Sequence, residues 1–243
     1  MVNFLTSNRK RSFAFLIYIF ILHSILIGII IYPNLALRLA IKLKLAPANE
    51  SVIYYIAAMN TMHARVDENT GPNAFIFIGD SLIQGLSVSS IRPVAVNFGI
   101  GHDTINGVLK RSLHYKSLRR ASSVIISVGI NDLRNNSVEQ VIAEYAIMLK
   151  QLRRISNIFI HELLPIDSKL QGIELKKKIS SFNKDLLKLA KSFDNIALLK
   201  SSNKFIDING DLKQSLHLGD GLHLNKDGYE IWIQQLKQQL SAK

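Results

Sequence analysis

The stretch Ala74-Phe75-Ile76-Phe77-Ile78-Gly79-Asp80-Ser81 (AFIFIGDS, residues 74–81) holds the pattern that decides the fold. Five consecutive apolar residues are typical of a strand buried on both faces of a sheet. The run then ends abruptly in a glycine, a carboxylate and a hydroxyl. Similar short apolar runs recur further along the chain, at residues 94–98, 124–128, 158–160 and 196–199.

Helix-like stretches separate these apolar runs. The clearest covers residues 137–155, where Ser137 and Gln140 have the spacing of a capping box. One face of this helix carries apolar residues at three- and four-residue spacing: Val141, Tyr145, Met148 and Leu152. Two more helices are predicted at 175–193 and at 226–240, the second capped by Asn225. The alternation predicts an α/β fold, a three-layer sandwich with a five-stranded parallel sheet.

The chain begins with a strongly apolar segment. Residues 13–32 read FAFLIYIFILHSILIGIIIY, and a helix of that length spans about 30 Å, the thickness of a bilayer core. We predict a short basic tail at 1–11 and a transmembrane signal anchor at 12–32. A cleaved signal peptide is the alternative, but its apolar core would be shorter.

Residues 33–72 are predicted to form an amphipathic juxtamembrane segment and a stem. Residues 34–45 (NLALRLAIKLKL) mix leucine with basic residues, which suits a helix lying on a membrane surface or a continuation of the anchor. A helix at 51–65 is expected to pack on the domain, and the polar stretch 67–73 marks its boundary. Short basic tails usually stay in the cytoplasm. The domain at 73–243 is therefore expected on the extracytoplasmic side of a single-pass membrane protein.

The composition narrows the classes of function. The formal net charge is +12 and there is no cysteine, which excludes disulfides, thiol nucleophiles and cysteine–zinc sites. The basic excess is spread, with clusters at Arg119-Arg120 and at residues 176–178. It suits an anionic surface at the cell envelope, or is simply a solvated basic face. Nucleic acid is not expected as a partner because no basic motif is interleaved with aromatic residues. The oligomeric state stays open.

Polar clusters follow the first three predicted strands. They are Gly79-Asp80-Ser81, residues 97–104 (NFGIGHDT) and residues 129–132 (GIND). A fourth cluster, residues 220–223 (DGLH), precedes the last helix. Because the carboxyl ends of parallel strands meet at one edge of a sheet, we expect the first three clusters to lie together.

These side chains suit acyl transfer. Ser81 could act as the nucleophile, His223 as its base, and Asp220 as the carboxylate that orients the base. The Ser81 N–H, an N–H at Gly101 or His102, and the Asn131 amide could stabilise an oxyanion. Losing one such donor typically raises a barrier by about 2.7–4 kcal/mol.

Simpler interpretations exist for the same residues. Ser81 could be only a helix N-cap. His217, Asp220 and His223 have a spacing that could suit a metal, but a metal site leaves Ser81 and Asn131 unexplained. The lone histidines His63, His114 and His161 are expected to be structural or surface residues.

The four clusters, in this order, resemble the motif blocks of the SGNH (GDSL-type) hydrolases. Further runs resemble the branch related to platelet-activating-factor acetylhydrolase catalytic subunits: Leu163-Leu164-Pro165, His223-Leu224 and Gly228-Tyr229. The resemblance covers about residues 73–241. It implies a flavodoxin-like sandwich, no metal or other cofactor, and hydrolysis of acyl or acetyl esters.

His102 departs from the family's second block. The residue before the Asp-Thr pair is usually glycine there, and its N–H points at the oxyanion. Histidine tolerates left-handed geometry better than most residues, so the His102 N–H is the expected donor. A shifted turn using Gly101, or an impaired oxyanion hole, is the alternative.

The sequence as a whole predicts a membrane-anchored serine esterase acting on an ester at the cell envelope, either a glycan O-acetyl group or a lysophospholipid-like ester. An O-acyl- or acetyltransferase using the same site is one alternative. A catalytically impaired envelope-binding module is the other.

Overall fold

The computed structural model describes residues 15–25, 27–28, 50–152, 154–155 and 157–241. The chain divides into two compact units, Met1–Tyr54 and Tyr55–Lys243. In the first unit, residues 15–25 and 27–28 are helical. Among all described residues, no helix is both long enough and apolar enough to cross a membrane. The predicted anchor lies partly outside these residues, and the tail at 1–11 and the amphipathic stretch at 34–45 lie wholly outside them, so the anchor stays a prediction.

The second unit contains a five-stranded parallel sheet, which confirms the predicted α/β class. Its strands are β1 (Phe75–Gly79), β2 (Ala95–Gly99), β3 (Ser123–Ser127), β4 (Ile158–His161) and β5 (Ile196–Leu199). Their order is β2-β1-β3-β4-β5, which is the flavodoxin-like order. Gly79 pairs with Gly99 on one side and with Ser127 on the other, so the first three strands end at the same level. The polar turns that follow them therefore begin side by side.

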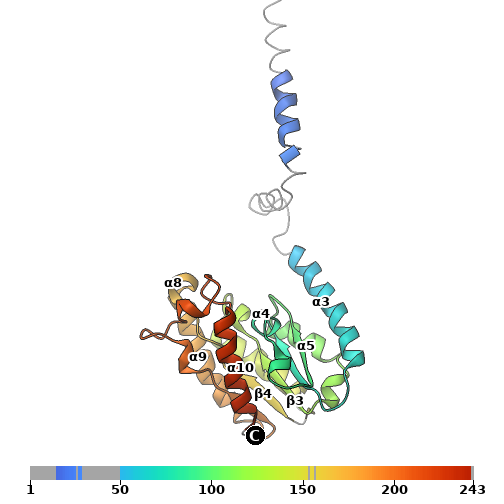
Figure 1. Ribbon diagram of the computed structural model, residues 1–243, viewed down its shortest axis with the longest axis vertical. Coiled ribbons are helices and arrows are strands. Elements are labelled where there is room, and N and C mark those ends of the chain that lie inside the picture. The colour runs from blue at the N-terminus through green and yellow to red at the C-terminus, as the bar shows by residue number, and fades with distance from the viewer. Residues whose placement is uncertain (1–14, 26, 29–49, 153, 156, 242–243) are drawn as a thin grey trace, which may run out of the picture. The chain divides into compact units, whose positions relative to one another are not determined.

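Helices cover both faces of this sheet (Figure 1). The α-helices are α3 (Glu50–Asn69), α4 (Ser81–Gln84), α5 (Ile105–Ser112), α6 (Ile130–Leu133), α7 (Val138–Leu152), α8 (Ser168–Gln171), α9 (Ile173–Ala190) and α10 (Lys226–Ser241). Short 3-10 turns lie at Val88–Ser90, Ser117–Arg120, Asn203–Phe205 and Gln214–Leu216. Side chains alternate across each strand, so neighbours on β2 face different layers: Asn97 bonds to α4, whereas Phe98 packs against Tyr115.

The caps predicted for two helices are confirmed. The Ser137 N–H donates to Gln140 Oε1 and the Gln140 N–H donates to Ser137 Oγ, which is the reciprocal bonding of a capping box. The predicted apolar face of α7 is buried along its whole length. Asn225 accepts the Gly228 N–H at the start of α10.

Helix α3 extends further than the predicted helix at 51–65. It continues to Asn69 because Asp67, expected in the polar boundary, is buried and accepts the N–H groups of Lys116 (2.8 Å) and Ser117 (2.9 Å). His63 is also buried, against the Phe98 ring. From Tyr55 onward, α3 therefore belongs to the compact unit that holds the sheet.

Candidate active site

Ser81 lies at the point where β1 turns into α4. Asp80 is the N-cap of that helix, and its carboxylate accepts the Leu82 N–H (3.0 Å). Gly79 is required at the turn because a Cβ there would lie 1.9 Å from the Ser127 carbonyl oxygen. The local sequence thus places a half-buried serine hydroxyl at the carboxyl edge of the sheet.

His223 and Asp220 meet this hydroxyl from the loop before α10. His223 Nε2 lies 2.9 Å from Ser81 Oγ, and His223 Nδ1 lies 2.5 Å from Asp220 Oδ2. The other carboxylate oxygen of Asp220 accepts the N–H groups of Leu222 and His223. Burial alone would raise the pKa of Asp220, but the hydrogen bonds from the His223 side chain and from both N–H groups outweigh it and hold the pKa below its usual range. Asp220 therefore stays ionised beside the imidazole.

His217 shapes the same loop through its ring nitrogen Nδ1. Its Nδ1 accepts the N–H groups of Gly219 (3.0 Å) and Gly221 (3.1 Å), which enclose Asp220. That nitrogen is therefore fully used. Across the residues that the structure describes, no group of three or more potential ligands is arranged to hold a metal ion. The spacing of His217, Asp220 and His223 reflects a tight turn.

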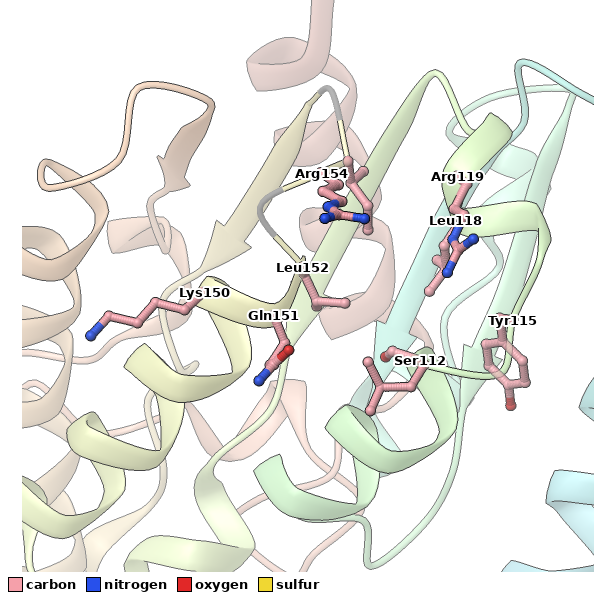
Figure 2. Close-up of a pocket in the computed structure, with 10 residues that line it drawn as sticks. Ser112, Tyr115, Leu118, Arg119, Lys150, Gln151, Leu152 and Arg154 are labelled. Carbon is pink, nitrogen blue, oxygen red and sulfur yellow. The ribbon is translucent and has the colours of Figure 1, made fainter.

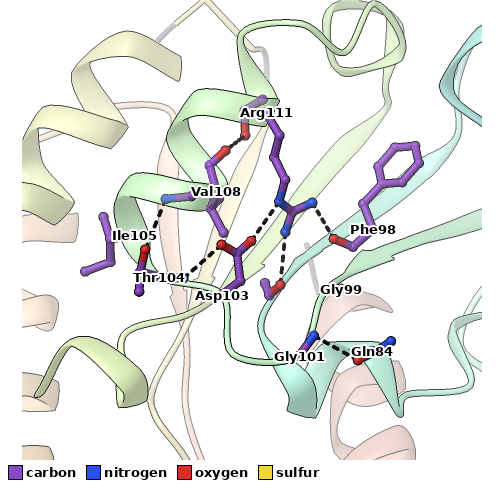
Figure 3. Close-up of polar contacts among 12 residues, drawn as sticks. Gln84, Phe98, Gly99, Gly101, Asp103, Thr104, Ile105, Val108 and Arg111 are labelled. Carbon is purple, nitrogen blue, oxygen red and sulfur yellow. Dashed lines mark hydrogen bonds and ion pairs between the residues drawn. The ribbon is translucent and has the colours of Figure 1, made fainter. Parts of the chain in front are cut away.

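The turn after β2 provides one candidate oxyanion donor and excludes another. The Gly101 N–H is already donated to Gln84 Oε1 (2.8 Å; Figure 3). His102 has a φ of 64°, its side chain is exposed, and its N–H has no hydrogen bond among the described residues.

Two further candidate donors lie outside this turn. The Ser81 N–H is likewise unpaired among the described residues. Asn131 Nδ2 uses one of its two hydrogens on the Asp103 carbonyl oxygen (2.9 Å), which orients the amide and leaves the second hydrogen.

A buried ion pair holds this turn against the sheet (Figure 3). Arg111 Nε bonds to Asp103 Oδ2 (2.8 Å), and both side chains are almost fully buried. The same guanidinium donates to the carbonyl oxygens of Phe98 (2.5 Å) and Gly79 (3.0 Å). Arg111 thus joins the ends of β1 and β2 to the turn that carries His102. Sequence reasoning missed Arg111, because nothing in its local pattern distinguishes it from a surface arginine.

Three buried carboxyl groups, those of Asp80, Asp103 and Asp132, lie at this edge of the sheet, and the Arg111 charge acts on Asp80 and Asp103. Burial raises the pKa of Asp80 to about 7 and that of Asp132 to about 6. Burial also raises the pKa of Asp103, although the Arg111 charge opposes the shift. The site therefore contains more buried carboxyl groups than the single Arg111 cation can neutralise.

A cavity of about 560 Å³ lies elsewhere, at the amino ends of β3 and β4 (Figure 2). Arg119, Lys150 and Arg154 line it, so the predicted basic cluster at Arg119 borders a pocket. It has none of the paired catalytic groups found at the carboxyl edge. The chemistry that the sequence predicts is thus concentrated at one edge, where the four polar clusters converge.

A serine presented at a strand-to-helix turn of a flavodoxin-like sandwich, paired with a histidine and an aspartate from the last loop, defines the serine ester hydrolase class. Residues 77–231 match the model of the GDSL-like lipase/acylhydrolase family, and the chain belongs to this family. The resemblance to SGNH (GDSL-type) hydrolases is thereby confirmed.

Solved structures share the fold. A Streptococcus pneumonia protein described as a platelet activating factor is 19% identical, with a TM-score of 0.74 over 84% of this chain and 99% of its own. A GDSL-like lipase from Bacteroides thetaiotaomicron is 18% identical (TM-score 0.65, 75% of this chain and 97% of its own). An acetylxylan esterase from Geobacillus stearothermophilus is 15% identical (TM-score 0.58, 70% and 94%). A search of curated proteins found no match.

Proposed function

We propose that this chain is a membrane-anchored serine esterase that hydrolyses acyl or acetyl esters at the cell envelope. The observation that carries the proposal is the continuous hydrogen-bonded chain Ser81–His223–Asp220, with 2.9 Å and 2.5 Å separations. Such a chain supplies a nucleophile, a base and a group that orients the base.

In the proposed mechanism, Ser81 Oγ attacks the ester carbonyl while its proton passes to His223 Nε2. Asp220 holds Nδ1–H and stabilises the imidazolium. His223 then protonates the leaving alcohol, and an acyl-enzyme on Ser81 remains. Water attacks this ester, again losing its proton to His223, and the carboxylic acid leaves with Ser81 restored.

The developing oxyanion is proposed to bind to three donors: the Ser81 N–H, the His102 N–H and the Asn131 amide. His102 is favoured over Gly101 because the Gly101 N–H already bonds to Gln84. The unpaired His102 N–H also argues against an impaired hole, since histidine tolerates the left-handed backbone that this turn adopts. This supports an active enzyme rather than an envelope-binding module.

Hydrolysis is the proposed reaction because the His223 and Asp220 side chains are 39% and 44% exposed, so water can reach the acyl-enzyme. The same opening would admit a sugar hydroxyl, so acyl transfer is the alternative reaction. Glycan O-acetyl groups and lysophospholipid-like esters are the proposed substrates, since an apolar N-terminal segment and a net charge of +12 suit an anionic envelope.

A product assay with and without a sugar acceptor separates hydrolysis from acyl transfer. Acyl transfer to the sugar in preference to water would replace the esterase with a transferase.

Fluorophosphonate labelling tests the nucleophile directly. We expect wild-type protein to label at Ser81 and Ser81→Ala to remain unlabelled. Ser87→Ala, at an exposed serine six positions later, serves as the control and should label fully. Labelling of Ser81→Ala at the wild-type level would reject the proposed nucleophile. A chain-length series of chromogenic esters would then define the acyl group.

A further inference from the structure

Helix α3 lies outside the residues that match the family model. One of its side chains nevertheless contacts the residue that supports the turn after β2, the oxyanion turn, which carries Gly101 and His102. The Tyr55 hydroxyl donates to Gln84 Oε1 (2.7 Å), the same oxygen that accepts the Gly101 N–H (2.8 Å; Figure 3). Two donors therefore converge on one side-chain carbonyl. Gln84 links the helix at which the chain enters the domain to the turn beside the nucleophile.

The three groups are packed closely as well as hydrogen-bonded. A Cβ at Gly101 would lie 3.1 Å from Gln84 Oε1 and 3.3 Å from the Tyr55 hydroxyl oxygen. Gln84 and Tyr55 are both half-buried, so neither side chain is simply solvated. The turn cannot shift toward α4 without displacing them.

This contact decides which backbone donor is available. His102 has a left-handed backbone (φ 64°), which a residue other than glycine keeps only where its surroundings hold it. Gln84 holds the residue before His102, and the Arg111–Asp103 ion pair holds the residue after it. Between these two restraints the His102 N–H makes no hydrogen bond to any part of the chain that the structure describes.

We propose that Tyr55 and Gln84 are positioning residues for the oxyanion hole, an inference that rests on the proposed esterase function. Gln84 occupies the Gly101 N–H and so leaves the His102 N–H as the donor. Tyr55 keeps the carbonyl of Gln84, rather than its NH₂ group, directed at the turn. Donors that are already oriented stabilise an oxyanion without reorganisation, so loosening this link should slow chemistry more than it weakens substrate binding.

The test compares Tyr55→Phe and Gln84→Met, which keep size and remove the hydrogen bonds. Each should lower kcat about three- to tenfold, with KM changed less than twofold, as for the loss of one or two hydrogen bonds. The double variant should be no slower than about the worse single variant, because both remove the same link. Titrating Ser81 with fluorophosphonate expresses kcat per folded, reactive site.

Two controls separate positioning from simple stability. Tyr54→Phe changes the adjacent, exposed tyrosine and should leave kcat unchanged. Asp67→Asn weakens the far end of α3, at Lys116 and Ser117, and should lower the Tm while leaving kcat per titrated site unchanged.

An unchanged kcat in Tyr55→Phe, multiplying effects in the double variant, or an equal kcat loss in Asp67→Asn would each overturn the positioning role while the esterase stands. A wild-type protein that does not label at Ser81 would instead reject the esterase proposal and this inference with it.

Discussion

Asp80, next to the proposed nucleophile, is both a helix cap and a buried acid. One carboxylate oxygen accepts the Leu82 N–H, while the other is buried without a hydrogen-bond partner among the described residues. Burial is the main reason that the pKa rises from 3.8 to about 7. The Leu82 bond opposes this shift, and the charges of Asp103 and Asp132 reinforce it. Asp80, which positions Ser81, therefore lowers the free energy of unfolding near neutral pH.

Replacing Asp80 with asparagine should remove that cost. The folded carboxyl keeps its proton up to about pH 7, whereas the unfolded one loses it near pH 3.8, so this group's contribution to stability falls as pH rises from about 4 to 7. Asparagine still accepts the Leu82 N–H and cannot ionise. The difference in unfolding free energy between Asp80→Asn and wild type should grow with pH, by an amount on the order of a few kcal/mol.

Urea unfolding from pH 4 to pH 8 measures this difference. Buried histidines such as His161, whose pKa burial lowers to about 4, titrate in both proteins and cancel in the subtraction. A difference that does not change with pH would show that Asp80 is ionised throughout.

His102→Gly tests whether the oxyanion turn needs the His102 side chain or only its N–H. Glycine adopts a φ of 64° without strain, and it keeps the N–H that we propose as the donor. Activity should stay level or rise. Removing an exposed imidazole from the edge of the site should also change the preferred acyl length. Measuring kcat/KM over a series of acetyl to octanoyl esters shows both effects.

His102→Val is the matched contrast, because a β-branched residue is strained in this conformation, and it should lose activity. If His102→Gly instead lost as much activity as His223→Ala, the His102 imidazole would itself be essential for catalysis, and a role through its N–H alone would be rejected.

At the scale of elements, the packing of α4 on β2 holds the nucleophile in place. A Cβ at Gly99 would lie 2.2 Å from the Gln84 backbone nitrogen, and Asn97 Nδ2 bonds to the Ile83 and Leu86 carbonyls at the end of α4. Gly99→Ala should therefore push α4 off the strand, lowering the Tm by well over 10 °C and abolishing activity, because backbone cannot yield as a side chain does.

Gly71→Ala is the control for this change, since a Cβ at Gly71 meets nothing within 4 Å. Thermal unfolding of both variants, followed by circular dichroism, gives the comparison. A Gly99→Ala protein as stable as Gly71→Ala would show that the approach of the two elements is looser than the structure indicates.

The elements themselves were largely predictable, because each has a local signature. The apolar run at 74–78 differs from β1 by one residue at each end, and the Ser137–Gln140 box begins α7 as expected. The short helix α8 was not predicted, since four residues carry too little periodicity to detect. Asp67 was placed in a polar boundary because its charge suggested solvent, whereas its partners lie about 50 residues further along the chain.

The site was predictable only as far as its groups follow strand ends. Aligned strand ends explain why Ser81 and Asn131 could be grouped from the sequence. The loop that brings in His223 and Asp220 follows no strand of the sheet, and only the chemistry of a nucleophile, a base and an orienting carboxylate groups it with them from the sequence. The contacts of Gln84 with Tyr55 and Gly101 join residues 29 and 17 positions apart through side chains whose rotamers no pattern specifies. The side-chain contacts that support the site could therefore not be predicted from the sequence.

At the scale of the whole molecule, two sequence properties point to a membrane by different physics. The apolar segment at 13–32 would bind through burial in the hydrocarbon layer, which salt does not weaken. The net charge of +12 would bind anionic head groups through electrostatics, which falls steeply as ionic strength rises. Sedimentation with membranes at low and high salt therefore tells anchoring from surface attraction.

We expect the full chain to sediment with membranes at both 0.1 M and about 1 M salt, where the Debye length is only about 3 Å, and to be released by detergent. Ile21→Lys together with Ile25→Lys should release it without detergent, since each lysine at the centre of a span costs roughly 2.5–3.5 kcal/mol. Ser81→Ala should sediment like wild type. Release of the wild-type chain by salt alone would leave the basic surface as its link to the membrane and would contradict the anchor.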